Sequence, residues 1–185
     1  MRNWLVLLLL VATPALARQN SFELDAPNGA VQSSTELTRL ADGQVFNLYI
    51  TPLDQHLGDS LYSTEIQVHF GPVGIAFSRL DPRIINKDID DPDKLPPIWE
   101  TRRLTGHGAT SIEDPRIVAL GSAGISLEDD QPFLLQARRS KGLLYLYHRA
   151  TADHKAHLLA KFQVAGAALP VSVKVIGYQV RFTLP

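Results

Sequence analysis

The chain has 185 residues, no cysteine and a formal net charge of −1 at neutral pH. This even balance excludes a general electrostatic attraction to nucleic acid or to anionic membranes, because both require clustered lysine and arginine. The lack of cysteine excludes structural disulfides, and a chain of this length buries enough apolar surface to fold as one domain without them.

Residues 1–17 have the pattern of a secretory signal peptide. One arginine precedes an apolar run, and Ala15-Leu16-Ala17 forms a small-residue cleavage site. The run is shorter than the roughly 20 residues that a membrane-spanning helix needs, and no later segment is long and apolar enough. We therefore expect a cleaved signal, a single domain over residues 18–185, no transmembrane segment, and a periplasmic or secreted protein. A bacterial periplasm is favoured because no asparagine begins a glycosylation sequon.

The first half of the mature chain contains short segments rich in β-branched and aromatic residues. Gly, Pro, Asp and Asn separate these segments, which is typical of an antiparallel β domain. A turn at Ala41-Asp42-Gly43 divides the first two segments. The predicted strands of this half are residues 32–40, 45–50, 63–70 and 74–80.

Residues 81–115 differ in composition, because they are rich in proline and charge. Proline limits regular strand pairing, so this region is predicted to be a long irregular insertion. Long loops in compact domains are commonly functional, which makes the insertion the first place to look for a binding surface. Two short strands, residues 116–120 and 125–127, are predicted after it.

The clearest hairpin lies in the second half of the chain. Residues 133–139 and 143–149 flank Ser140-Lys141-Gly142, where the glycine occupies a position that often requires positive φ. Residues 158–164 are predicted to form the next strand of a meander. Residues 151–162 are alternatively a short helix with Thr151 as its N-cap, since short apolar runs are ambiguous by period alone.

The last predicted strand, residues 171–184, completes a four-strand meander. Its apolar side chains change parity between Val175 and Tyr178, which predicts a bulge or bend near Ile176-Gly177. About ten strands without a consistent repeat predict an all-β fold. We expect a single antiparallel β-sandwich, jelly-roll or small barrel-like domain with the 81–115 insertion and at most one short helix.

Three histidines near the end of the hairpin are candidate metal ligands. His148, His154 and His157 flank a predicted return of the chain, and imidazole is a suitable ligand for zinc or copper. Their spacing matches no defined metal motif, so solvated histidines near a turn are the alternative interpretation.

No catalytic residue set is predicted. His107, Ser111 and Asp114 are the residue types of a nucleophilic triad, but nothing in their spacing requires them to meet. Ser122 lacks the first glycine of a nucleophile elbow, because a leucine stands at that position. The chain has no phosphate-binding loop and no dinucleotide fingerprint, so we predict no cofactor and no nucleic-acid partner.

Two groups of residues are candidates for binding a partner, because tryptophan and arginine often anchor interfaces. The first group, in the insertion, consists of Trp99, Arg102 and Arg103, although Trp99 could instead cover the core. At the hairpin they are Arg138 and Arg139. We therefore predict a non-enzymatic binding, inhibitory or assembly module of the bacterial cell envelope with a protein or glycan partner. The alternative is a periplasmic hydrolase or metal-binding protein that uses the histidine-containing loops.

Overall fold

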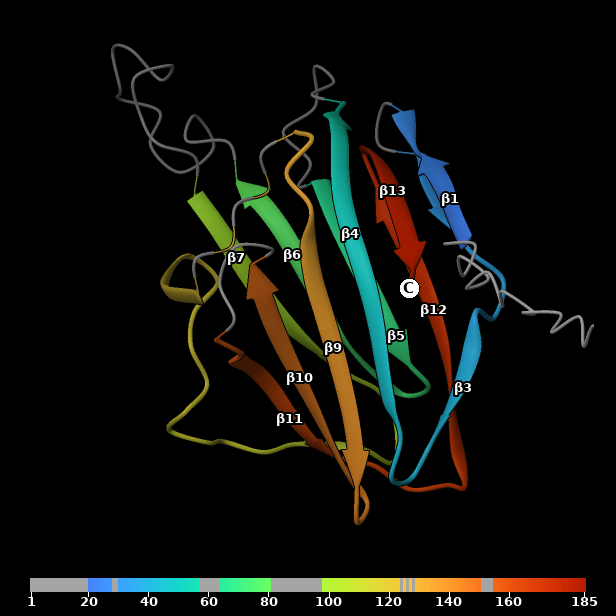
Figure 1. The fold of residues 1–185 in the computed structure, drawn as a ribbon, viewed down its shortest axis with the longest axis vertical. Coiled ribbons are helices and arrows are strands. Elements are labelled where there is room, and N and C mark those ends of the chain that lie inside the picture. The colour runs from blue at the N-terminus through green and yellow to red at the C-terminus, as the bar shows by residue number, and fades with distance from the viewer. Residues whose placement is uncertain are drawn as a thin grey trace, which may run out of the picture.

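The computed structural model describes residues 20–27, 30–56, 64–80, 98–123, 125, 127, 129–150 and 155–185. These residues form two antiparallel β-sheets packed face to face (Figure 1). The predicted all-β, sandwich-like fold is confirmed. The predicted signal peptide lies outside the described residues. In the part of the chain that is described, no helix has the length and apolar character needed to cross a membrane.

The larger sheet has seven strands in the order β1-β13-β4-β9-β10-β11-β8. Their bounds are β1 Asn20–Asp25, β13 Tyr178–Leu184, β4 Val45–Gln55, β9 Phe133–Ser140, β10 Leu143–Ala150, β11 His157–Gln163 and β8 Thr110–Ser111. The other sheet has the order β2-β12-β5-β6-β7, and β3 also pairs with β12. Their bounds are β2 Val31–Ser33, β12 Ala168–Ile176, β5 Thr64–Phe70, β6 Val73–Leu80, β7 Ile98–Thr105 and β3 Thr38–Ala41. A 3₁₀ turn, η3, spans Gly121–Ala123.

The hydrophobic core lies between the two sheets. In strands such as β9 and β12 alternate residues face inward, so their buried positions follow the two-residue period of a strand. Phe77 of β6 and Phe133 of β9 meet edge to face across the interface, with ring centroids 5.2 Å apart. Phe46 of β4 and Phe70 of β5 make a second such contact at 6.1 Å. Aromatic pairs therefore join the two sheets at two places.

The bend predicted near Ile176-Gly177 is confirmed. Strand β12 ends at Ile176, β13 begins at Tyr178, and the two strands belong to different sheets. Gly177 has a φ of 61°, and a Cβ at this position would lie 2.7 Å from Cγ2 of Thr64. Glycine is required here on both counts. The change of parity in the sequence thus marks the point at which the chain passes from one sheet to the other.

The predicted β9–β10 hairpin is also confirmed. Lys141 and Gly142 both have positive φ, at 53° and 74°, as a tight connection between twisted strands requires. Strand β11 continues this meander by pairing with β10. Strand β12 does not, because it pairs with β5 in the opposite sheet. The meander therefore has three strands, and the prediction of four is corrected.

Several predicted elements differ from the structure. The predicted strand over residues 32–40 is two strands, β2 and β3, separated by four residues. The alternative helix is excluded for residues 157–162 because they belong to β11, and residues 151–154 lie outside the described range. Between residues 116 and 120, Ile117 makes an isolated bridge to Leu158 rather than a strand. No strand is assigned at the described positions 125 and 127, whose side chains are buried in the core.

The predicted insertion over residues 81–115 is regular in part. Strand β7 pairs with β6 along its whole length, and β8 pairs with the end of β11. Residues 81–97 lie outside the described residues. Strand β7 was not predicted because its sequence, IWETRRLT, follows a proline-rich stretch and carries charges on adjacent positions. Such a pattern fits an edge strand, where one side of the backbone ladder faces away from the sheet.

Candidate functional site

An open groove of about 620 Å³ lies at the end of the six-stranded sheet where β5 turns into β6. Two strands and the turn between β5 and β6 contribute its walls. The lining residues are Gln67, His69, Gly71, Pro72, Arg102, Arg103, Leu104, Thr105 and Gly106. A concave surface of this volume is in the range that proteins use for small ligands.

The register of the sheet explains how residues of β5 and β7 reach one another across β6. Gln67 pairs with Ala76, and Ala76 pairs with Arg102, so the three form one row across the sheet. Three successive outward positions of β6 carry small residues, namely Gly74, Ala76 and Ser78. Because Ala76 is small, the Arg102 side chain is able to pass over β6 toward β5.

A chain of hydrogen bonds runs along the outward face of β5. Nη2 of Arg102 donates to Oε1 of Glu65 at 2.7 Å, and the amide nitrogen of Gln67 donates to the other oxygen of Glu65. Nε2 of His69 lies 2.9 Å from Oε1 of Gln67. Glu65 and Gln67 are only 6% and 7% exposed, although they point away from the core. These bonds satisfy polar groups whose burial would otherwise be costly.

The direction of these hydrogen bonds assigns the tautomer of His69. A carboxylate only accepts, so the Gln67 amide nitrogen faces Glu65 and the Gln67 oxygen faces His69. The Gln67 oxygen in turn only accepts, so Nε2 of His69 must carry the proton. Burial lowers the pKa of His69, Lys174 lowers it further, and Glu65 opposes them. His69 is therefore neutral at pH 7, with Nδ1 as its acceptor.

The two predicted binding residues Arg102 and Arg103 point to opposite sides of β7. Arg102 lies on the outer face, with its side chain 59% exposed. Arg103 donates to Oγ of Ser111 at 3.1 Å and pairs with Glu113 at 2.8 Å. It thereby links the edge of the six-stranded sheet to β8 of the other sheet. The backbone of Trp99 pairs with Arg79, while the Trp99 side chain lies outside what the structure describes.

Arg138 and Arg139 also separate, because neighbouring residues of a strand face opposite sides of the sheet. Arg138 lies exposed on the outer face of β9. Arg139 is 3% exposed and has the parity of the buried side chains of β9. Its guanidinium donates to the carbonyl oxygens of Leu40, Ala167 and Gly166. Arg139 is thus a structural residue that holds chain segments together, and the predicted basic surface does not include it.

Two of the three predicted metal ligands come together. His148 and His157 are opposite residues of β10 and β11, and their rings are nearly parallel with centroids 6.2 Å apart. Phe133 packs edge-on against His148, which is buried. His154 lies outside the described residues. Among the residues that are described, no three His, Cys, Asp or Glu side chains converge in a way that could hold a metal ion. The predicted site of three histidines stays a prediction.

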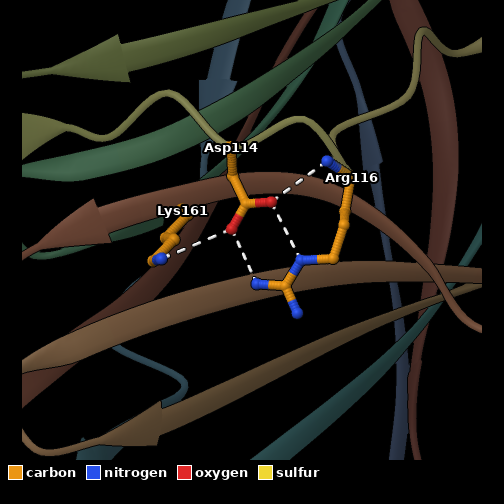
Figure 2. A network of polar contacts seen from close by, with 3 residues as sticks. All are labelled: Asp114, Arg116 and Lys161. Carbon is orange, nitrogen blue, oxygen red and sulfur yellow. Dashed lines mark hydrogen bonds and ion pairs between the residues drawn. The ribbon is translucent and has the colours of Figure 1, made fainter.

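A polar network ties the segment before η3 to the outer face of the seven-stranded sheet (Figure 2). Asp114 accepts from Arg116 through both carboxylate oxygens, at 2.9 and 2.7 Å, and its second oxygen lies 3.3 Å from Nζ of Lys161. Its side chain is only 6% exposed. The hydrogen bonds from Arg116 are the main cause that holds the pKa of Asp114 well below its usual range. Lys161 also lies over the Tyr145 ring.

The network predicts a specific loss of stability in acid. A carboxyl group whose pKa is lowered by folding stabilises the folded state above its unfolded pKa of 3.8, and this contribution fades as the pH falls below that value. We expect Asp114→Asn to be less stable than the wild type at pH 6 and to approach it toward pH 2. Urea unfolding at several pH values measures the difference. A gap that is independent of pH would contradict this role.

The possible nucleophilic residues are not arranged as a triad. Asp114 is engaged by Arg116 and Lys161, and the hydroxyl of Ser111 accepts a hydrogen bond from Arg103. His107 is exposed in the turn after β7.

Gln67 and His69 were not identified as candidate site residues from the sequence. The sequence TEIQVHF alternates polar and apolar residues, and every outward side chain of β5 is able to form hydrogen bonds. This alternation could have indicated a polar row on the outer face of the sheet.

No family model matches this chain, and no curated protein matches it. Among solved structures, a protein of unknown function from Saccharomyces cerevisiae is similar to it, with a TM-score of 0.36 and 12% sequence identity. The similarity covers 88% of this chain and 92% of the yeast chain. A similarity of this size gives no information about the function of the chain.

Proposed function

We propose that the protein is exported to the bacterial cell envelope, where it acts as a non-enzymatic binding module. The groove between β5 and β7 is its binding surface. The pattern of residues 1–17 supports export. Its role is to hold a partner, as an inhibitor or assembly factor does, and the groove residues provide recognition rather than chemistry.

One observation carries this proposal. Glu65, Gln67 and His69 form an ordered hydrogen-bonded chain that ends at Arg102 beside an open groove. Outward side chains on a sandwich are normally solvated, yet here a carboxylate and an amide are buried. Buried ion pairs contribute little net stability, so stability alone is a weak reason for such an arrangement. A network that fixes the position of an arginine and an imidazole is well suited to recognition.

The proposal is tested by native mass spectrometry of the protein purified gently from its own cell envelope. The wild type is expected to begin at Arg18 and to carry an added mass from its partner. Arg102→Gln should lose that mass because the guanidinium lines the groove. The matched control is Arg181→Gln, which changes an ion-paired arginine on the outer face of the other sheet and should retain it. Retention of the partner by Arg102→Gln would argue against the groove.

The same spectrum addresses the alternative function. An excess mass equal to one metal ion, removed by a chelator and absent from His157→Ala, would support the metal-binding interpretation. The stacking of His148 and His157 is the observation that keeps this alternative open.

A further inference from the structure

The groove offers a ligand a small and specific set of polar groups. Nη2 of Arg102 is used by Glu65, which leaves the other N–H groups of the guanidinium as donors. Both ends of the Gln67 amide are occupied within the network. His69 uses Nε2 as a donor, so its remaining ring nitrogen, Nδ1, is an acceptor. A matching ligand must accept from Arg102 and donate to His69 over a short distance.

The position of the groove on a sheet favours a sugar over a peptide. Within a sheet, backbone N–H and C=O groups point along the plane toward neighbouring strands, so a ligand lying on the face meets side chains. Extended peptides are commonly bound by adding a strand at a sheet edge, where backbone groups pair with backbone groups. A peptide that lies over the outward side chains would lack those partners, which the edge of β7 offers, whereas sugar hydroxyls both donate to and accept from side chains.

The charges of the groove favour an anionic sugar. The Arg102 guanidinium lies on the groove side of β7, and no carboxylate is among the described lining residues of the groove. Glu65 lies buried behind Arg102 as its ion-pair partner, whereas Arg103 points to the other side of β7 and pairs there with Glu113. Lys174 pairs in register with Gln67, which places a second cation beside the row that contains Arg102, while Glu100 lies one row farther along β7. A carboxylate is the group that arginine binds with the best geometry.

We infer that the groove binds an acidic oligosaccharide, with a sugar carboxylate on the Arg102 guanidinium and a sugar hydroxyl donating to Nδ1 of His69. This inference rests on the proposed function of the groove as a binding surface. Gly71, Pro72 and Leu104 provide the less polar surface against which a sugar ring packs. The volume of about 620 Å³ accommodates a short oligosaccharide.

Isothermal titration of residues 18–185 at pH 7 tests this with three probes: trigalacturonate, maltotriose and triglutamate. Trigalacturonate is expected to bind at least about tenfold more tightly than either of the others, since a charge-assisted hydrogen bond is worth more than a neutral one. Arg102→Gln should weaken trigalacturonate binding by about tenfold or more. Arg181→Gln should leave it unchanged.

Arg102→Gln leaves Glu65 buried without its cation and could therefore prevent folding. A second variant separates a loss of binding from a loss of folding. Glu65→Gln combined with Arg102→Gln removes both charges together and should fold while still failing to bind trigalacturonate. Equal binding of triglutamate would overturn the inference in favour of a peptide, and equal binding of maltotriose would overturn the role of charge. If no sugar binds but the partner mass in the native spectrum still depends on Arg102, the sugar inference fails while the binding groove stands.

Discussion

Arg139→Met is expected to lower the free energy of unfolding by about 2–4 kcal/mol, because the buried carbonyl of Leu40 and two partly buried carbonyls lose their donor. The guanidinium of Arg139 donates to carbonyl oxygens at the end of β3 and in the connection between β11 and β12. Methionine preserves much of the side-chain volume but leaves the buried carbonyl of Leu40 unsatisfied, while water is able to reach the carbonyls of the exposed residues Gly166 and Ala167. Equilibrium unfolding in urea, monitored by tryptophan fluorescence, measures the loss.

Arg138→Met is the matched control, because it makes the same chemical change at the preceding residue, which lies on the exposed face of β9. It is expected to change stability by no more than about 0.5 kcal/mol. Arg139→Lys should behave more like Arg139→Met than like the wild type, since one ammonium group lacks the span of a guanidinium. Equal stability of the two methionine variants would show that the buried guanidinium does not stabilise the fold.

Phe77→Ala is expected to lower the free energy of unfolding by about 3–5 kcal/mol. The Phe77 ring is fully buried in β6 and meets Phe133 of the opposite sheet edge to face. Its removal leaves a cavity between the sheets and also ends the aromatic contact. The same urea measurement detects the change.

Phe22→Ala provides the comparison for this prediction. Phe22 stacks on Phe182 with centroids 5.3 Å apart, but it lies on the edge strand β1 and is only partly buried. Its replacement should cost clearly less than that of Phe77, because water is able to fill the space that the ring vacates. An equal cost at both positions would contradict a core centred between β6 and β9.

The two-residue period of a β-strand predicts which side chains are buried, and it was applied to only one of the two segments in which it was informative. The change of parity in the last long segment correctly predicted the bend at Gly177. The same rule applies to Arg138 and Arg139, which are neighbours in a predicted strand. Arg139 shares its parity with Phe133 and Ala137, so its burial could have been predicted from the sequence. Grouping the two arginines as one basic surface overlooked this period.

The groove could not be predicted from the sequence. Its ion pair joins Glu65 to Arg102, which are 37 residues apart, and depends on the register that places Ala76 between their strands. Register between distant strands is set by the packing of the whole sandwich, and a local pattern does not specify it. Strand β7 was also missed, because a charged edge strand beside prolines has the composition of a loop.

Photo-crosslinking in living cells tests most directly whether the groove is the binding surface. A p-benzoylphenylalanine placed at Leu104 lies in the groove, and the same residue placed at Tyr145 lies on the outer face of the other sheet. Our account predicts an adduct from position 104, its loss when Arg102 is replaced by glutamine, and none from position 145. An adduct that forms from position 145 and not from position 104 would contradict it.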